Sequence, residues 1–140
     1  LRETVELFRT HEHIHFDVRI DEPLPLVRGD REEFARAMTN VLRNAVQAMH
    51  TEGGIDVTAR REGAVLRITI TDTGIGIPAS LLPRIFEPNF RTKTEGMGLG
   101  LAIVRKIITD MDGSISIDSV EGRGTEVTIL LPASAAVTEE

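Results

Sequence analysis

An aspartate followed by two glycines is the first feature of this chain that could do chemistry. Asp72 ends a segment of alternating apolar and polar residues, and the alternation puts its carboxylate on the apolar face. Burying a carboxylate costs free energy unless it is paired or hydrogen-bonded. Gly74 and Gly76 follow, and glycine lets a backbone approach a ligand closely. A buried acceptor beside a bare backbone suits an amino-bearing ring such as adenine, although an ordinary turn explains the same residues.

Two asparagines form a second candidate site. Asn40 and Asn44 are four residues apart in a predicted helix, so their side chains share one face. Asparagine is a weak helix former. Two stacked amide oxygens suit a hard cation such as Mg2+, with phosphate oxygens and water as its other ligands. A solvated helix face with one local hydrogen bond explains the pair equally well.

Glycines also cluster where a second long helix is predicted to begin, in the run from Gly96 to Gly100. The free backbone N–H groups at a helix start attract anions. Arg91 and Lys93 lie just upstream, so this part of the chain is a candidate phosphate site, with a tight helix entry as the alternative. The spacing matches neither the dinucleotide-binding pattern G-x-G-x-x-G nor a P-loop.

Composition narrows the classes of function. The chain has 140 residues, of which 41% are hydrophobic and 27% charged, as is ordinary for one globular domain. A net charge of -6 argues against non-specific nucleic-acid binding, which needs a basic surface. The absence of cysteine excludes disulfides and thiolate metal sites. No apolar run is long enough to cross a membrane, so we expect no membrane contact by this segment.

The spacing of apolar residues predicts five strands and two long helices. A short helical pattern covers residues 1–9, and alternation predicts a strand over Ile14 to Ile20. Asp30 is predicted to cap a helix that runs to about His50, with Glu33 completing a capping box. The remaining predicted elements are strands at 55–61 and 66–71, a loop-rich segment at 73–98, a helix at 99–111 with Gly113 as its cap, and strands around 115–117 and 127–131.

This order of elements predicts an α+β fold, a two-layer α/β sandwich. Tight hairpins imply antiparallel strand pairs, so we expect a mixed, mostly antiparallel five-stranded sheet packed under two long helices. The expected buried residues of the helices are Phe34, Met38, Val41, Leu42, Ala45 and Met49 in the first, and Ile103, Val104, Ile107, Ile108 and Met111 in the second. Residues 13–132 form the expected domain, and 133–140 an expected flexible tail.

Together these motifs resemble, in order and spacing, the ATP-binding domain of the sensor histidine kinases, within the wider family of gyrase, chaperone, kinase and mismatch-repair ATPases. The similar blocks are Asn40 to Ala45 (N box), Asp72 to Pro78 (G1 box), Ile85 to Phe90 (F box), Gly96 to Leu101 (G2 box) and Gly122 to Thr125. The run Asn44 to Met49 is most similar to kinases of the nitrogen-regulation type. The resemblance implies a Bergerat-type ATP-binding fold.

The resemblance also implies a site for ATP and Mg2+. Asn44 would be the Mg2+ ligand with Asn40 near the phosphates, and Asp72 would accept from the adenine amino group. Thr125 would help to hold the base through water, and residues 89–98 would form a lid with Phe86 and Phe90 at its two ends. The other implied ATP-binding residues are Gln47, Gly74, Gly76, Ile77, Arg91, Thr92, Lys93, Gly96, Met97, Gly98, Leu99 and Gly100. No residue is assigned a catalytic role with certainty.

Two residues depart from the family pattern. Arg36 lies one turn before Asn40, where many relatives have Glu or Gln, and Gln47 stands where some relatives carry a phosphate-binding Lys. Both changes are expected to weaken phosphate contacts or to shift them onto Lys93.

The phosphoacceptor unit of these kinases, a helical hairpin that bears a histidine, is not recognisable in the chain. His11, His13 and His15 fall at the start of a predicted strand and are interpreted as a solvated edge, with adventitious metal binding as the alternative. Residues 1–12 are therefore expected to be the end of a linker from a missing dimerisation domain.

The expected function is transfer of the γ-phosphoryl group of Mg-ATP to a histidine on a separate dimerisation domain of the same parent protein. This would take place in the cytoplasm and would serve a response regulator indirectly. Two alternatives stay open. The first is an ATP-hydrolysing conformational machine like the gyrase and chaperone relatives. The second is a nucleotide-sensing module or an anti-sigma-type serine kinase of the same superfamily.

Overall fold

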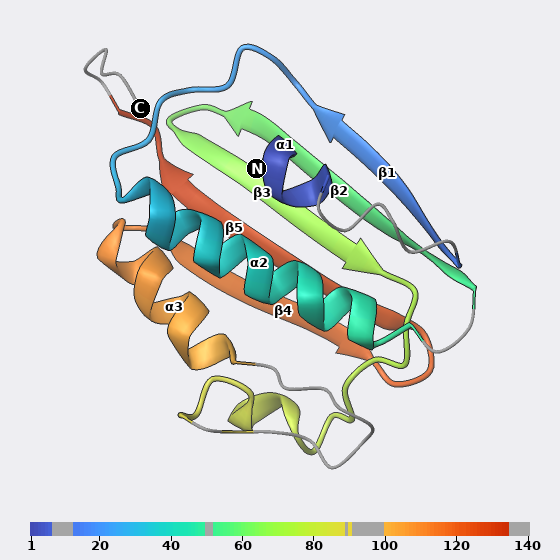
Figure 1. Ribbon diagram of the computed structural model, residues 1–140. Helices are drawn as coiled ribbons and strands as arrows, with labels where there is room; N and C mark the ends of the chain where they lie inside the picture. Colours follow the sequence, from blue (N-terminus) through green and yellow to red (C-terminus); the bar gives the residue numbers. More distant parts are fainter. Residues whose placement is uncertain (7–12, 50–51, 89, 91–99, 135–140) are drawn as a thin grey trace.

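Five strands form a single sheet in the order β1-β2-β3-β5-β4 (Figure 1). The computed structural model describes residues 1–6, 13–49, 52–88, 90 and 100–134. The strands are β1 (Ile14–Ile20), β2 (Gly53–Glu62), β3 (Val65–Asp72), β4 (Ser114–Val120) and β5 (Gly124–Pro132). Only β1 and β2 pair in parallel, and the other three pairs are antiparallel. The predicted mixed, mostly antiparallel sheet is confirmed.

The helices α1, α2 and α3 lie on one face of this sheet (Figure 1). The helical elements are α1 (Arg2–Glu6), α2 (Arg31–Gln47), the 3-10 turn η1 (Leu82–Arg84) and α3 (Leu101–Asp110). Because parallel strands need a crossover connection, α2 must cross the sheet between β1 and β2, and α3 packs beside it. The second layer predicted from the sequence is therefore confirmed.

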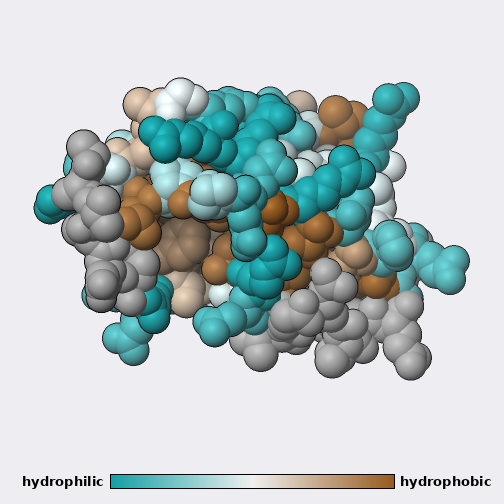
Figure 2. All heavy atoms as spheres, turned by 90° about the horizontal axis from the view of Figure 1, so that it is seen from above, coloured by the Kyte–Doolittle hydropathy of each residue, from teal (hydrophilic) through white to brown (hydrophobic). Residues whose placement is uncertain are grey.

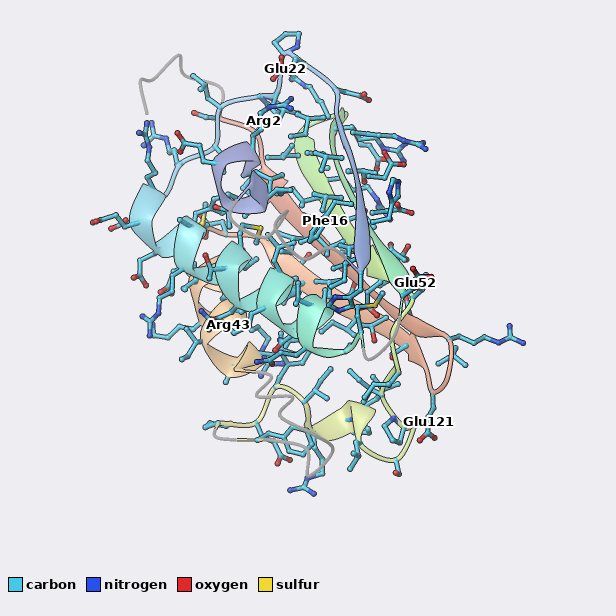
Figure 3. All side chains as sticks on the ribbon, turned by 45° about the vertical axis from the view of Figure 1, so that its right-hand side comes forward. Arg2, Phe16, Glu22, Arg43, Glu52 and Glu121 are labelled. Carbon is cyan, nitrogen blue, oxygen red and sulfur yellow. The ribbon has the colours of Figure 1, made fainter. Side chains whose placement is uncertain are left out.

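The first residues of the chain pack on this domain. In α1, Val5 is only 1% exposed, and Arg2 pairs with Glu22 at 3.4 Å, which ties the helix to the connection after β1 (Figure 3). At the other end of the chain, the backbone N–H groups of Ala133 and Ser134 donate to carbonyls of Ala64 and Leu26. The rest of the predicted linker and tail, 7–12 and 135–140, lies outside the described residues.

Helix α2 begins as predicted and ends earlier. The Asp30 carboxylate accepts from the backbone N–H groups of Glu32 and Glu33, at 2.8 and 3.1 Å, so it is the N-cap. The helix ends at Gln47 rather than near His50. The carbonyl of Ala48, just beyond the helix, accepts from Ile75 N at 3.0 Å. This bond joins the end of α2 to the loop after β3.

Two details predicted for α3 are wrong. Ile103 is 40% exposed, because it lies two residues, and so about half a turn, from Leu101, which faces the sheet. The left-handed residue at the end of the helix is Asp112, with φ 61°, rather than Gly113. Aspartate tolerates the left-handed conformation because its short polar side chain can form local hydrogen bonds with the backbone. Gly113 is still required, since a Cβ there would lie 2.4 Å from the carbonyl oxygen of Leu130.

In the described part of the chain, a hollow lies between the layers at each end of β3. The larger has a volume of about 420 Å3 and is lined by α1, the connection after β1 and the first turn of α2. Figure 2 looks onto this end and shows brown hydrophobic atoms in a recess framed by teal hydrophilic ones. None of the described residues predicted to bind ATP lines it. They gather instead at the other end, where β3 finishes at Asp72.

Candidate functional site

A small pocket between α2 and the sheet brings four predicted site residues together: Asn44, Asp72, Ile77 and Thr125. They come from α2, from the end of β3, from the loop after it and from β5. The other lining residues are all apolar: Val41, Ala45, Ile70, Leu101, Ile117 and Val127. The volume of the pocket is about 20 Å3, which is too small for a base ring. A base therefore enters only if the lining side chains, or the backbone segments that carry them, move apart.

Asp72 is the buried charge of this pocket. It is 6% exposed and lies on the same face of β3 as Leu66, Ile68 and Ile70, as the alternation predicts. Its Oδ1 accepts from Gly74 N at 2.8 Å. Burial raises the pKa of the Asp72 carboxyl to about 6, against the smaller lowering by the backbone N–H groups of Gly74 and Thr125. A carboxylate has about four acceptor positions, so Asp72 retains acceptor capacity toward the pocket.

The two glycines of the loop after β3 pack against the protein's own backbone. A Cβ on Gly74 would lie 2.5 Å from the carbonyl oxygen of Ala48. Gly76 has φ 73°, and a Cβ there would lie 2.2 Å from the carbonyl oxygen of Val120. Beyond the predicted approach to a ligand, these glycines allow the loop to sit tightly between α2 and the β4–β5 turn.

Ser119 joins the loop to the β4–β5 hairpin. Its Oγ accepts from Ile77 N at 2.8 Å and lies 3.0 Å from Gly124 O and 2.7 Å from Thr125 Oγ1. Nearby, Gly122 N donates to Ile75 O at 2.7 Å, and Figure 3 places Glu121 in the same turn. Ser119 was not predicted from the sequence to belong to the site. Its signal was a polar residue at an inward position of β4, as Asp72 is in β3.

Asn40 and Gln47 lie on α2 but do not line the pocket. Asn40 is half-buried one turn before Asn44, and its Oδ1 accepts from Arg43 at 3.4 Å. Gln47 is half-buried in the last turn of the helix. Of the three α2 residues predicted to belong to the site, only Asn44 therefore lines the pocket together with Asp72 and its apolar neighbours.

The predicted ends of the lid are two half-buried phenylalanines. Phe86 packs on the core with the Arg105 guanidinium 4.7 Å from its ring centre, and Phe90 has Arg84 at 5.1 Å. Gly100, at φ 59°, precedes the first residue of α3. The intervening predicted phosphate-binding residues lie outside the described part of the chain: Arg91, Thr92, Lys93, Gly96, Met97, Gly98 and Leu99.

Other kinds of site are not found in the described residues. No group of three or more His, Asp or Glu side chains there is arranged to hold a metal ion. His13 and His15 are exposed at the start of β1, as predicted, and His11 lies outside the described residues. No described helix is long and apolar enough to span a membrane.

The pocket and its sheet can now be compared with known proteins. The model of the histidine kinase-, DNA gyrase B- and HSP90-like ATPases matches residues 29–135, which include every described residue of the site. The chain belongs to this family. The ATPase family thus accounts for both the order of the motifs and the fold that positions them.

Curated relatives place the chain among the sensor histidine kinases. It is 41% identical over 114 residues to the sensor histidine kinase ZraS of Escherichia coli K12, covering 81% of this chain and 24% of ZraS. It is 38% identical over 148 residues to the nitrogen regulation protein NtrY of Azorhizobium caulinodans, covering 99% of this chain and 19% of NtrY. The chain thus spans about a quarter of these relatives or less, and the nitrogen-regulation subtype is compatible with the second match.

Solved structures of histidine kinases also match the fold of this chain. The catalytic domain of the histidine kinase ThkA, in a nucleotide-free form, matches with a TM-score of 0.83 and 33% identity, covering 94% of this chain and 89% of that one. Full-length ShkA in complex with AMPPNP matches with a TM-score of 0.81 and 33% identity, covering 97% of this chain and 30% of ShkA. The chain is an ATP-binding catalytic domain of the sensor histidine kinase type.

The raised pKa of Asp72 predicts how stability depends on pH. The carboxyl titrates at about 6 in the folded state and near 3.9 in an unfolded chain, so between these values the folded state binds more protons. The contribution of Asp72 to the free energy of unfolding therefore falls as pH rises from about 4 to 6, by up to about 3 kcal/mol, and is constant above that.

Urea unfolding at a series of pH values, for wild type and Asp72→Asn, measures this slope. The difference between the two proteins should change across that window and be flat above pH 7. A difference that stays constant from pH 4 to pH 7 would show that the Asp72 carboxyl is not buried as described.

Proposed function

We propose that this domain transfers the γ-phosphoryl group of Mg-ATP to a histidine on a separate dimerisation domain of the same parent protein. The observation that carries the proposal is the buried Asp72 carboxylate in a mostly apolar pocket that is also lined by Asn44 of α2. A buried acceptor with apolar surroundings fits an adenine ring, whose amino group is a donor at its edge.

The base would be recognised by a charged acceptor and by the apolar side chains that line the pocket. Asp72 accepts from the adenine amino group, and Ile77, Leu101 and Val127 supply contact surface for the ring. Charge-assisted hydrogen bonds are about twice as strong as neutral ones. Burial raises the pKa of Asp72 to about 6, so the carboxyl is mostly ionised at pH 7 and can accept such a bond.

Mg2+ fits the polar side of the pocket. The Asn44 amide oxygen is a hard donor of the kind Mg2+ accepts, and this ion keeps several waters and phosphate oxygens as its other ligands. When bound, the ion would neutralise charge on the β- and γ-phosphates during transfer. We assign Asn44 as its protein ligand and place Asn40 near the phosphates, one turn away on α2.

The phosphates would extend toward the start of α3. Gly100 and Gly98 would present backbone N–H groups to them, and Arg91 and Lys93 would approach them from the lid, residues 89–98. Thr92, Gly96, Met97 and Leu99 complete the proposed lid-side contacts, and Gln47 those from α2. The arrangement of an ion, basic side chains and oriented amides is what phosphoryl transfer requires.

The partners follow from the same assignment. The phosphoacceptor histidine lies on a dimerisation domain of the parent protein, and a response regulator receives the phosphoryl group from it, in the cytoplasm. ThkA supports this, since that histidine kinase has been solved in complex with the response regulator protein TrrA. The domain matched there is 29% identical to this chain with a TM-score of 0.78.

Substitution of Asn44 separates metal binding from base binding. Asn44→Ala should weaken binding of Mg-ADP by about tenfold or more, since it removes a ligand of the ion, while binding of adenosine stays within about twofold. Calorimetry with each ligand measures both effects. Equal losses for Mg-ADP and adenosine would show that Asn44 does not act through the metal.

Phosphotransfer tests the proposed function as a whole. The chain is incubated with Mg-ATP labelled at the γ-phosphate, alone and with the purified dimerisation domain of its parent. We expect acid-labile phosphate on the dimerisation domain and little on this chain by itself. Stoichiometric acid-labile phosphate on the isolated chain would contradict the proposal. Acid-stable phosphoserine on a partner, or rapid ATP hydrolysis by the chain alone, would favour the serine-kinase or ATPase alternatives.

A further inference from the structure

Ser119 is half-buried beside the proposed base pocket and contacts three separate groups of the chain. It is the last inward-facing residue of β4 and pairs in register with Thr125 of β5. Thr125 in turn pairs in register with Asp72 of β3. Three neighbouring strands therefore place Ser119, Thr125 and Asp72 in one row across the sheet, and the last two line the pocket.

The hydrogen bonds of Ser119 determine where the Thr125 proton points. A backbone N–H group is always a donor, so Ser119 Oγ accepts from Ile77 N at 2.8 Å. A carbonyl oxygen is always an acceptor, so Ser119 Oγ donates to Gly124 O at 3.0 Å. A serine hydroxyl has one proton, and this proton is given to Gly124. The 2.7 Å contact between Ser119 Oγ and Thr125 Oγ1 must then be donated by Thr125.

Thr125 consequently offers only acceptor positions to the pocket. Its single hydroxyl proton is held by Ser119, so the lone pairs of Oγ1 remain for a ligand. The ionised Asp72 carboxylate is also an acceptor. A base that enters between them and contacts both directly therefore meets two acceptors.

We propose that Ser119 is a positioning residue for base specificity: by holding the Thr125 proton, it makes the pocket select a 6-amino purine over a 6-oxo purine. The inference rests on the proposed nucleotide site. A 6-amino group donates to both acceptors, whereas a 6-oxo group would face them as a third acceptor. With Ser119 removed, the Thr125 hydroxyl can rotate and donate to a 6-oxo group, so discrimination declines.

Ser119 also supports the loop that carries Ile77, and a test has to separate this role from the first. Ile77 is 3% exposed and its N–H has Ser119 as an acceptor, so loss of the hydroxyl also loosens the loop. A loosened loop weakens binding of every base to the same degree. A misdirected Thr125 proton changes the ratio between two bases.

The ratio of the dissociation constants for IDP and ADP is the appropriate measurement, because these nucleotides differ only in the 6-substituent and in the N1 proton that the 6-oxo form carries. The N1 proton is present whichever protein variant is used, so a change of the ratio between variants reports the contact at the 6-position. Wild type should prefer ADP strongly. Ser119→Ala should narrow the ratio by about tenfold, the effect of one hydrogen bond to the base. Ser116→Ala is the matched control, since Ser116 is exposed on the same strand, and it should leave the ratio unchanged.

Thr125 variants show whether Ser119 acts through that hydroxyl. Thr125→Val should narrow the ratio of the IDP and ADP dissociation constants, and Thr125→Ser should keep this ratio at the wild-type value. In the Thr125→Val background, Ser119→Ala should cause no further change of the ratio. Should Ser119→Ala fail to fold, Ser119→Cys, which keeps the size of the side chain, is expected to narrow the ratio in its place.

Two results would overturn the inference. One is an equal loss of ADP and IDP affinity on removal of the Ser119 hydroxyl, which leaves the ratio intact. The other is a further narrowing in the Thr125→Val background. Either would leave the nucleotide site standing, whereas a wild-type chain that binds neither nucleotide would refute the proposed function itself.

Discussion

The site depends on one constraint, which is that the Asp72 carboxylate is held among aliphatic side chains at the end of β3. Its own backbone neighbours satisfy only part of its hydrogen-bonding capacity, at Gly74 and Thr125, and burial still raises its pKa to about 6. The fold thus maintains a group that is costly to bury, in a place where a donor-bearing ring can complete its hydrogen bonds.

Neighbouring elements are arranged around that carboxylate. The loop after β3 is pinned on one side by the carbonyl of Ala48, at the end of α2, and on the other by Ser119 of β4. Gly74 and Gly76 make both contacts possible, since a side chain at either position would collide with backbone. Helix α2, which is joined to this loop through Ala48, carries Asn44 to the same pocket, so connected elements position the residues proposed to bind the base and the metal ion.

Much of this arrangement could be predicted from local patterns. The alternation in β3 is strict, so it predicted that Asp72 lies on the buried face. Asp30, followed by Glu32 and Glu33 in the first helical turn, marked the start of α2. Ile103 and Gly113 were misassigned because helix phase and the left-handed residue depend on packing that a short apolar run does not specify. Ser119 was missed because its partners lie in three segments that only the folded sheet brings together.

Calorimetry of ADP binding to wild type and Asp72→Asn at pH 7.5 tests the central claim most directly. The substitution keeps the size of the side chain and removes the charged acceptor. Loss of one charge-assisted hydrogen bond, about 1.5–3 kcal/mol, predicts a dissociation constant raised roughly 10- to 150-fold. An unchanged dissociation constant, in a variant that is folded, would show that the buried carboxylate does not read the base.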